Sequence, residues 1–314
     1  MLIILLFLSL LALFYLLGKT TEVAVFSINK ISSTFKLPIF FVGILLGLFT
    51  SLPELMIGIN ALVDDISEVS FGNLLGGSLV LFGLIFGLGL MLERKVLTDG
   101  KIIHIIPILG YLFLPFLFGF DGSIKGVESI ILILLYPLML FLLFKQHKNE
   151  IGPDVRVTVH KKTFIKNCFW LILVLIGVAL ISHTIIIITA YLLKWFHVQG
   201  FVVGLLLFAI GTNLPELSVM IASWKTKTSE LSLSHLIGSV IVDPLLIGIF
   251  SLIRPYESNA GFFMANTMMF SLLLFAAVAY FYRTGKRFTR EEGFILFTIY
   301  LAFAITNVGI SLKS

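Results

Sequence analysis

The motifs TSLPEL at residues 50–55 and GTNLPEL at residues 211–217 each place a threonine, a proline and a glutamate inside a long apolar stretch. Proline lacks the N–H that continues a helix and clashes with the preceding turn, so each motif predicts a break in a helix. Ionisable residues inside apolar spans are rare and by default functional. The two motifs therefore predict two broken helices with a carboxylate at each break.

The composition predicts a membrane protein. The 314 residues are 59% hydrophobic and 12% charged, whereas soluble domains carry about 25% charged residues. Because the basic residues lie between apolar runs, we interpret the net charge of +5 as a topology signal and expect no nucleic-acid partner. The single cysteine, Cys168, excludes an internal disulfide framework.

The apolar segments are long enough to cross a bilayer, which takes about 20 residues in a helix. The polar breaks between them predict an all-α protein with ten transmembrane helices near 2–29, 37–63, 69–92, 101–120, 125–144, 164–193, 200–224, 231–252, 258–282 and 292–312. The first segment lacks a basic leader and an A-x-A site, so we interpret it as a helix and not as a cleaved signal peptide.

Basic residues predict the orientation, because cytoplasmic loops carry an excess of Lys and Arg. One set of alternating loops holds seventeen of them: Lys30, Lys36, Arg94, Lys95, Lys101, Lys145, Lys148, Arg156, Lys161, Lys162, Lys166, Lys225, Lys227, Arg283, Lys286, Arg287 and Arg290. The opposite loops hold four: Lys125, Lys194, Arg254 and Lys313. We expect a multi-pass protein of the cell membrane, with both termini outside and the linker between the halves in the cytoplasm.

The sequence repeats itself at an offset of 162 residues. Without a gap, 15 of the 41 positions from 45 to 85 are identical to their partners, including the T-x-L-P-E-L motif and the S-E-x-S motif at residues 67–70. We predict a first repeat at 1–144, a linker at 145–163 and a second repeat at 164–314. Five helices per half is an odd number, so the second half enters the membrane from the opposite side. Inverted repeats of this kind carry ion sites near the midplane, on broken helices.

The breaks also predict the chemistry of the site. A carbonyl freed by a proline, a threonine hydroxyl and a glutamate carboxylate are all oxygen ligands, which suit a hard cation such as Ca²⁺. The histidines other than His235 show no spacing typical of zinc ligands.

Two further motifs follow the breaks, FGNLLGGS at residues 71–78 and SHLIGSVIVD at residues 234–243. Together with the proline motifs they resemble the two alpha repeats of the cation/calcium exchanger superfamily, whose best-known members are the sodium/calcium exchangers. The resemblance implies antiport of Ca²⁺ against Na⁺ (or H⁺, or K⁺ with Na⁺) by alternating access. It implies no enzyme activity and no cofactor. The expected partners are calcium and sodium ions and membrane lipid, and no protein partner is evident.

The resemblance assigns the cation ligands residue by residue. Matches to the family pattern are Glu54, Glu216, Thr50, Thr212, Ser51, Asn73, Ser239 and Asp243, while Asn213 and His235 stand at motif positions with a different residue. Gly77 and Leu81 replace two oxygen-bearing residues on the third helix, so we expect a lopsided site that binds fewer Na⁺ or couples Ca²⁺ to H⁺. His235 is either a hydrogen-bonding replacement for asparagine or a proton-titrating group.

Three other function classes remain open. An intramembrane protease using two carboxylates is disfavoured, because the chain lacks a G-x-G-D motif. The others are a channel and a transporter-like protein that has lost exchange activity, the latter motivated by Gly77 and Leu81.

Overall fold

Helices make up nearly all of the computed structural model. It describes residues 2–32, 39–92, 96–147, 161–196, 198–226, 229–257, 261–284 and 286–311. Ten helical spans in this part of the chain are long and apolar enough to cross a membrane, in agreement with the ten predicted segments. Of the predicted linker 145–163, residues 148–160 lie outside the described residues.

The unbroken spans are α1 (Leu2–Ser32), α6 (Ile102–Phe118) with the short η3 (Gly119–Asp121), α7 (Val127–His147), α8 (Lys161–Phe196), α14 (Gly261–Thr284) and α15 (Arg290–Ser311). The interrupted spans are α2 (Ile39–Thr50) with α3 (Leu52–Val63), α4 (Ser67–Leu79) with η2 (Val80–Ile85) and α5 (Phe86–Leu92), α9 (Gly200–Val203) with η4 (Gly204–Phe208), α10 (Ala209–Thr212) and α11 (Leu214–Thr226), and α12 (Ser229–Val240) with α13 (Val242–Ile253).

Both predicted breaks are present. The second span is interrupted at Ser51 and the seventh at Asn213, each two residues before a proline of the repeat. The eighth span has a further break at Ile241, between α12 and α13. Pro244 accounts for it, because this proline cannot donate a hydrogen bond to the carbonyl four residues earlier. In the third span the equivalent stretch continues as the π-helical turn η2.

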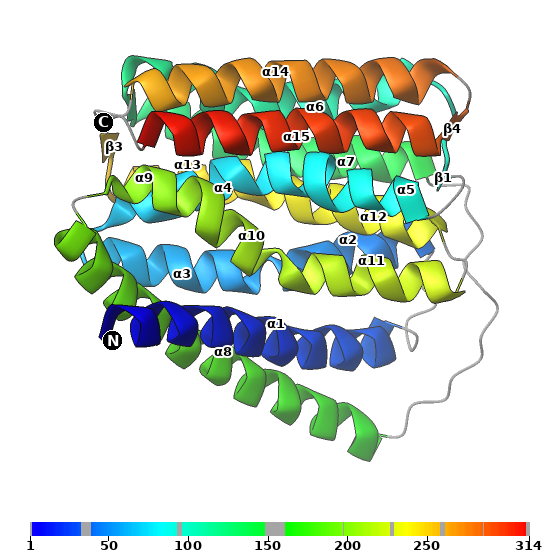
Figure 1. Ribbon diagram of the computed structural model, residues 1–314. Coiled ribbons are helices and arrows are strands. Elements are labelled where there is room, and N and C mark those ends of the chain that lie inside the picture. Colours follow the sequence, from blue (N-terminus) through cyan, green and yellow to red (C-terminus); the bar gives the residue numbers. More distant parts are fainter. Residues whose placement is uncertain are drawn as a thin grey trace.

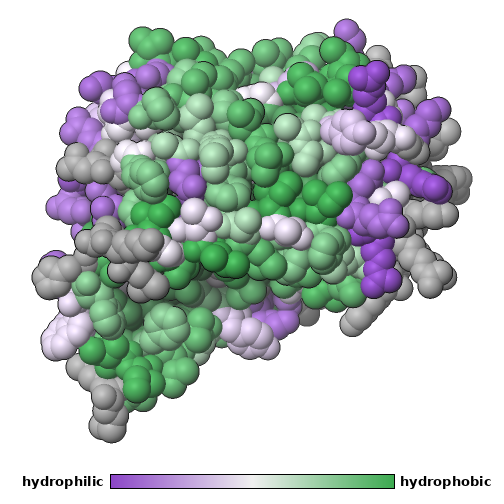
Figure 2. Space-filling model, turned by 45° about the horizontal axis from the view of Figure 1, so that its top comes forward, coloured by the Kyte–Doolittle hydropathy of each residue, from purple (hydrophilic) through white to green (hydrophobic). Residues whose placement is uncertain are grey.

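The spans form two five-helix repeats of inverted topology. Figure 1 shows both termini at one end of the molecule, as an even number of spans requires, with α1 and α8 side by side along one face. The surface carries an apolar band between two polar ends, as Figure 2 shows. This is the pattern expected when lipid is the solvent around the middle of the protein.

Each repeat packs its broken helix against a helix of the other repeat. Helix α2 packs against α12, and the α9–η4–α10 segment packs against α4. The crossings are close: a Cβ on Gly47 would lie 2.2 Å from the Ser239 amide nitrogen, and one on Gly76 would lie 2.7 Å from the Ala209 Cβ. Residues 47 and 209, and residues 76 and 238, are partners in the 162-residue register, so the two crossings are equivalent. Small residues allow such backbone approach in membrane helices.

Two short antiparallel ladders tie loops together at opposite ends. Strand β1 (Val96–Leu97) pairs with β4 (Arg287–Phe288), and β2 (Ser123–Ile124) pairs with β3 (Tyr256–Glu257). Figure 1 shows β1 and β4 at the end opposite the termini and β3 at the end with the termini. These ladders are not predictable from the sequence, because two-residue strands leave no periodic pattern.

The helix crossings predict a stability effect at Gly72. A Cβ on Gly72 would lie 2.1 Å from the Phe201 carbonyl oxygen, a backbone atom that cannot move aside. We expect Gly72→Ala to destabilise the protein by about 1–3 kcal/mol, the usual range for overpacking. Thermal unfolding of the purified protein in detergent measures this. The matched control is Gly110→Ala on α6, where a Cβ meets nothing within 4 Å. Equal melting temperatures for the two variants would contradict the close crossing.

Candidate cation-binding site

Three buried carboxylates lie at three helix breaks. Glu54, Glu216 and Asp243 each occupy the first turn of the half-helix that follows a break, on α3, α11 and α13. All three are almost completely buried. The N-terminal end of a helix carries a partial positive charge that stabilises an anion. Each break therefore supplies a local backbone reason for a carboxylate to lie inside the protein.

The hydroxyl groups before the breaks make a pair of equivalent contacts. Thr50 Oγ1 lies 3.2 Å from His235 Nε2, and Thr212 Oγ1 donates a hydrogen bond of 3.1 Å to Asn73 Oδ1. In the 162-residue register, Thr50 corresponds to Thr212 and Asn73 to His235. The same relation holds for the carboxylates, because Thr212 lies within hydrogen-bonding reach of Glu54 and Thr50 of Glu216. His235 thus takes the structural place of an asparagine.

The residues at the breaks saturate some of the backbone carbonyls. The hydroxyls of Thr50 and Ser51 each donate to the Gly47 carbonyl at 3.0 Å, and the Asn213 amide donates to the Ala209 carbonyl at 2.8 Å. Gly47 also keeps its helical bond from the Ser51 amide at 3.1 Å. The carbonyls freed by the missing proline N–H are those four residues earlier, on Phe49 and Gly211. That freed carbonyls are cation ligands therefore stays a prediction.

The two halves of the site differ at one pair of positions. Ser239 Oγ donates a hydrogen bond of 2.8 Å to Glu216 Oε1 and lies 3.2 Å from Ser51 Oγ. Its register partner is Gly77, which has no side chain to offer Glu54. The hydrogen bond that Ser239 makes to Glu216 therefore has no side-chain counterpart from Gly77 in the first repeat. That the cation site is lopsided stays a prediction.

Within the described part of the chain, each of the three carboxylates keeps one buried oxygen without a hydrogen-bond partner: Glu54 Oε2, Glu216 Oε2 and Asp243 Oδ2. The three groups also lie close enough for their charges to repel one another. A buried polar atom without a partner is destabilising, and more so when it is charged. A bound cation relieves both the missing contacts and the repulsion.

All ten residues predicted for the site are buried and belong to this cluster: Glu54, Glu216, Asp243, Thr50, Thr212, Ser51, Asn213, Ser239, Asn73 and His235. Among the described residues, however, no group of three or more His, Cys, Asp or Glu side chains converges in the geometry of a metal centre. Of the three carboxylates, Asp243 lines a small cavity between α4, α6 and α13, together with Ser78 and Pro115.

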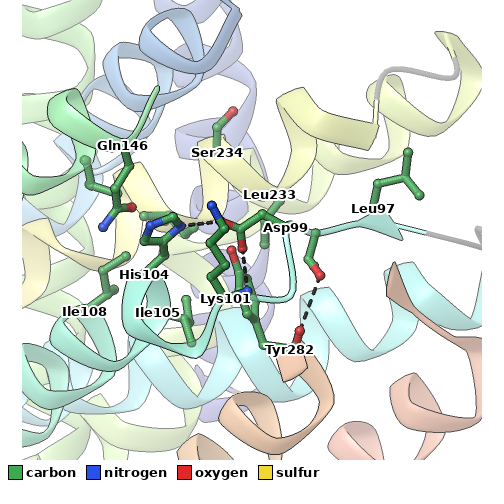
Figure 3. Close-up of a pocket in the computed structure, with 13 residues that line it drawn as sticks. Leu97, Asp99, Lys101, His104, Ile105, Ile108, Gln146, Leu233, Ser234 and Tyr282 are labelled. Atoms are coloured by element: carbon green, nitrogen blue, oxygen red, sulfur yellow. Dashed lines mark hydrogen bonds and ion pairs between the residues drawn. The ribbon is translucent and has the colours of Figure 1, made fainter. Parts of the chain in front are cut away.

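A separate pocket of about 430 Å³ opens at the end that carries β1, as Figure 3 shows. Its wall on α12 consists of Leu233, Ser234 and Ile237. Leu233 and Ile237 each lie two residues from His235, which places them on nearly the opposite side of α12, since a step of two residues turns a helix by about 200°. Ser234 lies between the two faces, about 100° from His235. The pocket is therefore separated from the carboxylates by the body of α12.

Asp99 lines this pocket and contacts several of the residues around it (Figure 3). Its carboxylate accepts a hydrogen bond from the Lys101 amide at 3.0 Å and pairs with His104. Burial raises the pKa of Asp99, but the contacts with Lys101, Tyr282 and His104 outweigh it and hold the pKa below its usual value. Asp99 thereby joins the start of α6 to α14. The sequence analysis did not select it, because it lies in a polar loop with no motif.

The family model described as "Sodium/calcium exchanger protein" matches residues 5–145 and 166–309. The chain is 24% identical to an uncharacterized membrane protein of Methanocaldococcus jannaschii, covering 90% of this chain and 91% of that protein. It is also 24% identical to the sodium/calcium exchanger MaX1 of Methanosarcina acetivorans, covering 95% and 97% of the two chains.

Two kinds of solved structure share the fold. A structure of the sodium-calcium exchanger NCX_Mj superposes with a TM-score of 0.66 at 22% identity, covering 96% of this chain and 98% of that chain. A structure of an H⁺/Ca²⁺ exchanger, CAX, superposes with a TM-score of 0.72 at 15% identity, covering 97% and 87% of the two chains. At these identities the superpositions speak for the fold alone.

Proposed function

The chain belongs to the sodium/calcium exchanger protein family, and from this premise we propose that it is a secondary antiporter that exchanges Ca²⁺ for Na⁺ by alternating access. Membership makes it a cation/calcium exchanger, a transporter and not an enzyme. The observation that carries the finer proposal is the presence of three buried carboxylates at three helix breaks, each with one oxygen that has no hydrogen-bond partner among the described residues.

The donor set suits a calcium ion that travels as cargo. Ca²⁺ takes about six to eight oxygen ligands. Glu54, Glu216 and Asp243 offer the charge, and Thr50, Thr212, Ser51, Ser239, Asn73 and Asn213 offer neutral oxygens around them. His235 acts in this proposal as a hydrogen-bonding neighbour of Thr50.

Competition for the same carboxylates gives the exchange. Up to three negative charges are balanced either by one Ca²⁺ with a proton or by several monovalent ions. Since either set satisfies the same oxygens, binding of one excludes the other. A second candidate is Ca²⁺/H⁺ exchange, favoured by Gly77 and Leu81, which offer no side-chain oxygen to a monovalent ion on α4 and η2.

The charge test concerns the two repeat glutamates. We expect Glu54→Gln and Glu216→Gln each to abolish Ca²⁺ uptake into everted vesicles, because each keeps the shape of the side chain and removes a charge that a desolvated dication requires. The control is Glu291→Gln, an exposed glutamate in the first turn of α15. Wild-type uptake in both site variants would mean that the cation binds elsewhere.

The coupling ion is tested by Ca²⁺ flux in proteoliposomes under either an imposed Na⁺ gradient or an imposed pH gradient. We expect Ca²⁺ to move against its own gradient under at least one of them, with weaker Na⁺ dependence than in an exchanger that keeps oxygen ligands at the positions of Gly77 and Leu81. Flux that runs only down the Ca²⁺ gradient indicates a channel. No flux in a folded protein indicates a transporter-like protein without exchange activity.

We also propose that the protein lies in the cell membrane with both termini outside. The basic loops at one end support this orientation. In a Cys168→Ser background, we expect a cysteine at Lys125 to react with a membrane-impermeant thiol reagent in whole cells and a cysteine at Lys101 to react only after permeabilisation. Both native side chains are exposed, at opposite ends of the molecule. The reverse labelling pattern would overturn the orientation and leave the exchange proposal standing.

A further inference from the structure

Gly77 differs from the neighbouring glycines of α4 in what surrounds it. A Cβ on Gly72 or Gly76 would approach backbone carbonyls of the seventh span, at 2.1 Å from the Phe201 oxygen and 2.4 Å from the Leu205 oxygen. Those two glycines permit helix crossing. A Cβ on Gly77 would instead lie 2.9 Å from Asp243 Oδ2 and 3.6 Å from Asn213 Nδ2. The missing side chain of Gly77 leaves room for a charged atom of the candidate site.

The internal repeat shows what this space holds in the other half. Ser239, the partner of Gly77, places its hydroxyl between Ser51, at the break of the second span, and Glu216, in the first turn after the break of the seventh span. At Gly77 the hydroxyl is absent and the Asp243 carboxylate lies beside the space instead. A neutral donor in one half is thus replaced by an anion in the other.

Asp243 itself has no acidic partner in the repeat, since the residue 162 positions earlier is Leu81. It enters the space beside Gly77 from the first turn of α13, directly after the break at Ile241. Its Oδ2 atom, the one nearest to Gly77, has no hydrogen-bond partner among the described residues. The backbone of α13 positions the carboxylate there, and the absence of a side chain on Gly77 leaves space for it. No polar side chain among the described residues binds the Oδ2 atom.

We infer that Gly77 is a specificity-determining residue, which sets the position of the Asp243 carboxylate against α4 and thereby makes the cation site strongly anionic and selective for a divalent over a monovalent ion. The inference rests on the proposed function. On this inference Gly77 does more than leave out an oxygen ligand. A serine at this position would bring one neutral hydroxyl oxygen but displace the charged Oδ2 atom of Asp243.

The test is a double-mutant cycle on Gly77 and Asp243, read out as Ca²⁺ binding and its competition by Na⁺ on the purified full-length protein. We expect Gly77→Ala to lower the Ca²⁺ affinity about tenfold, which corresponds to about 1.4 kcal/mol, and to lower the Na⁺ affinity less. Asp243→Asn lowers the Ca²⁺ affinity in the wild-type background and has a clearly smaller effect when Gly77→Ala is already present, because contacting residues are not additive. Gly110→Ala serves as the control, with unchanged binding.

Thermal unfolding separates a crowded site from a misfolded variant. We expect Gly77→Ala to lower the melting temperature in the wild-type background and to have no such effect in an Asp243→Ala background, where the carboxylate no longer occupies the space. Equal destabilisation in both backgrounds, or additive effects on Ca²⁺ binding, overturns the inference. A wild-type protein that binds no Ca²⁺ overturns the proposed function and this inference with it, whereas wild-type binding with an additive cycle overturns the inference alone.

Discussion

Placing carboxylates at the depth of an apolar bilayer is the constraint on which the rest of this structure depends. A buried charge is tolerated only when it is paired or hydrogen-bonded, and backbone without its helical hydrogen bonds is tolerated only inside protein. Each break creates a helix N-terminus, whose partial positive charge and free N–H groups stabilise the carboxylate in the first turn of the same helix. The backbone at the breaks must also be kept away from lipid, and the close crossings of α2 with α12 and of α4 with the seventh span bury it inside the protein.

The internal repeat extends from the fold down to single atoms. The contact of Thr50 with His235 and that of Thr212 with Asn73 are equivalent in the two repeats. The threonine is the same in both, and histidine replaces asparagine in the second repeat. Such agreement is expected when two copies of one unit pack across a pseudo-twofold axis. Gly77 with Ser239 and Leu81 with Asp243 are positions where the side chains of the two repeats offer different oxygen atoms to the site.

The sequence predicted more of this molecule than is usual, for a physical reason. Ten apolar segments and two prolines are local signals, and the repeat converts them into spatial ones, because residues at equivalent positions must make equivalent contacts. The two proline motifs predict two breaks, and the third, at Ile241, appears only in the structure. The capping of Gly47 and Ala209 by side chains, the ladders between loops, and the approach of Asp243 to Gly77 could not be predicted, since each depends on distances between elements that no spacing in the chain encodes.

The same electrostatics that makes the site hard to build also favours coupled transport. Three carboxylates that repel one another in a dry interior make the ion-free, fully charged site unfavourable, since charges interact far more strongly there than in water. In the proposed function, a divalent cation, several monovalent cations or protons neutralise the site and stabilise it. A protein that changes its access only in a neutralised state cannot return empty, and this is the property that turns a binding site into an exchanger. Because Leu81 and Gly77 leave the first repeat without the polar side chains of the second, that neutralisation depends chiefly on the three charges themselves.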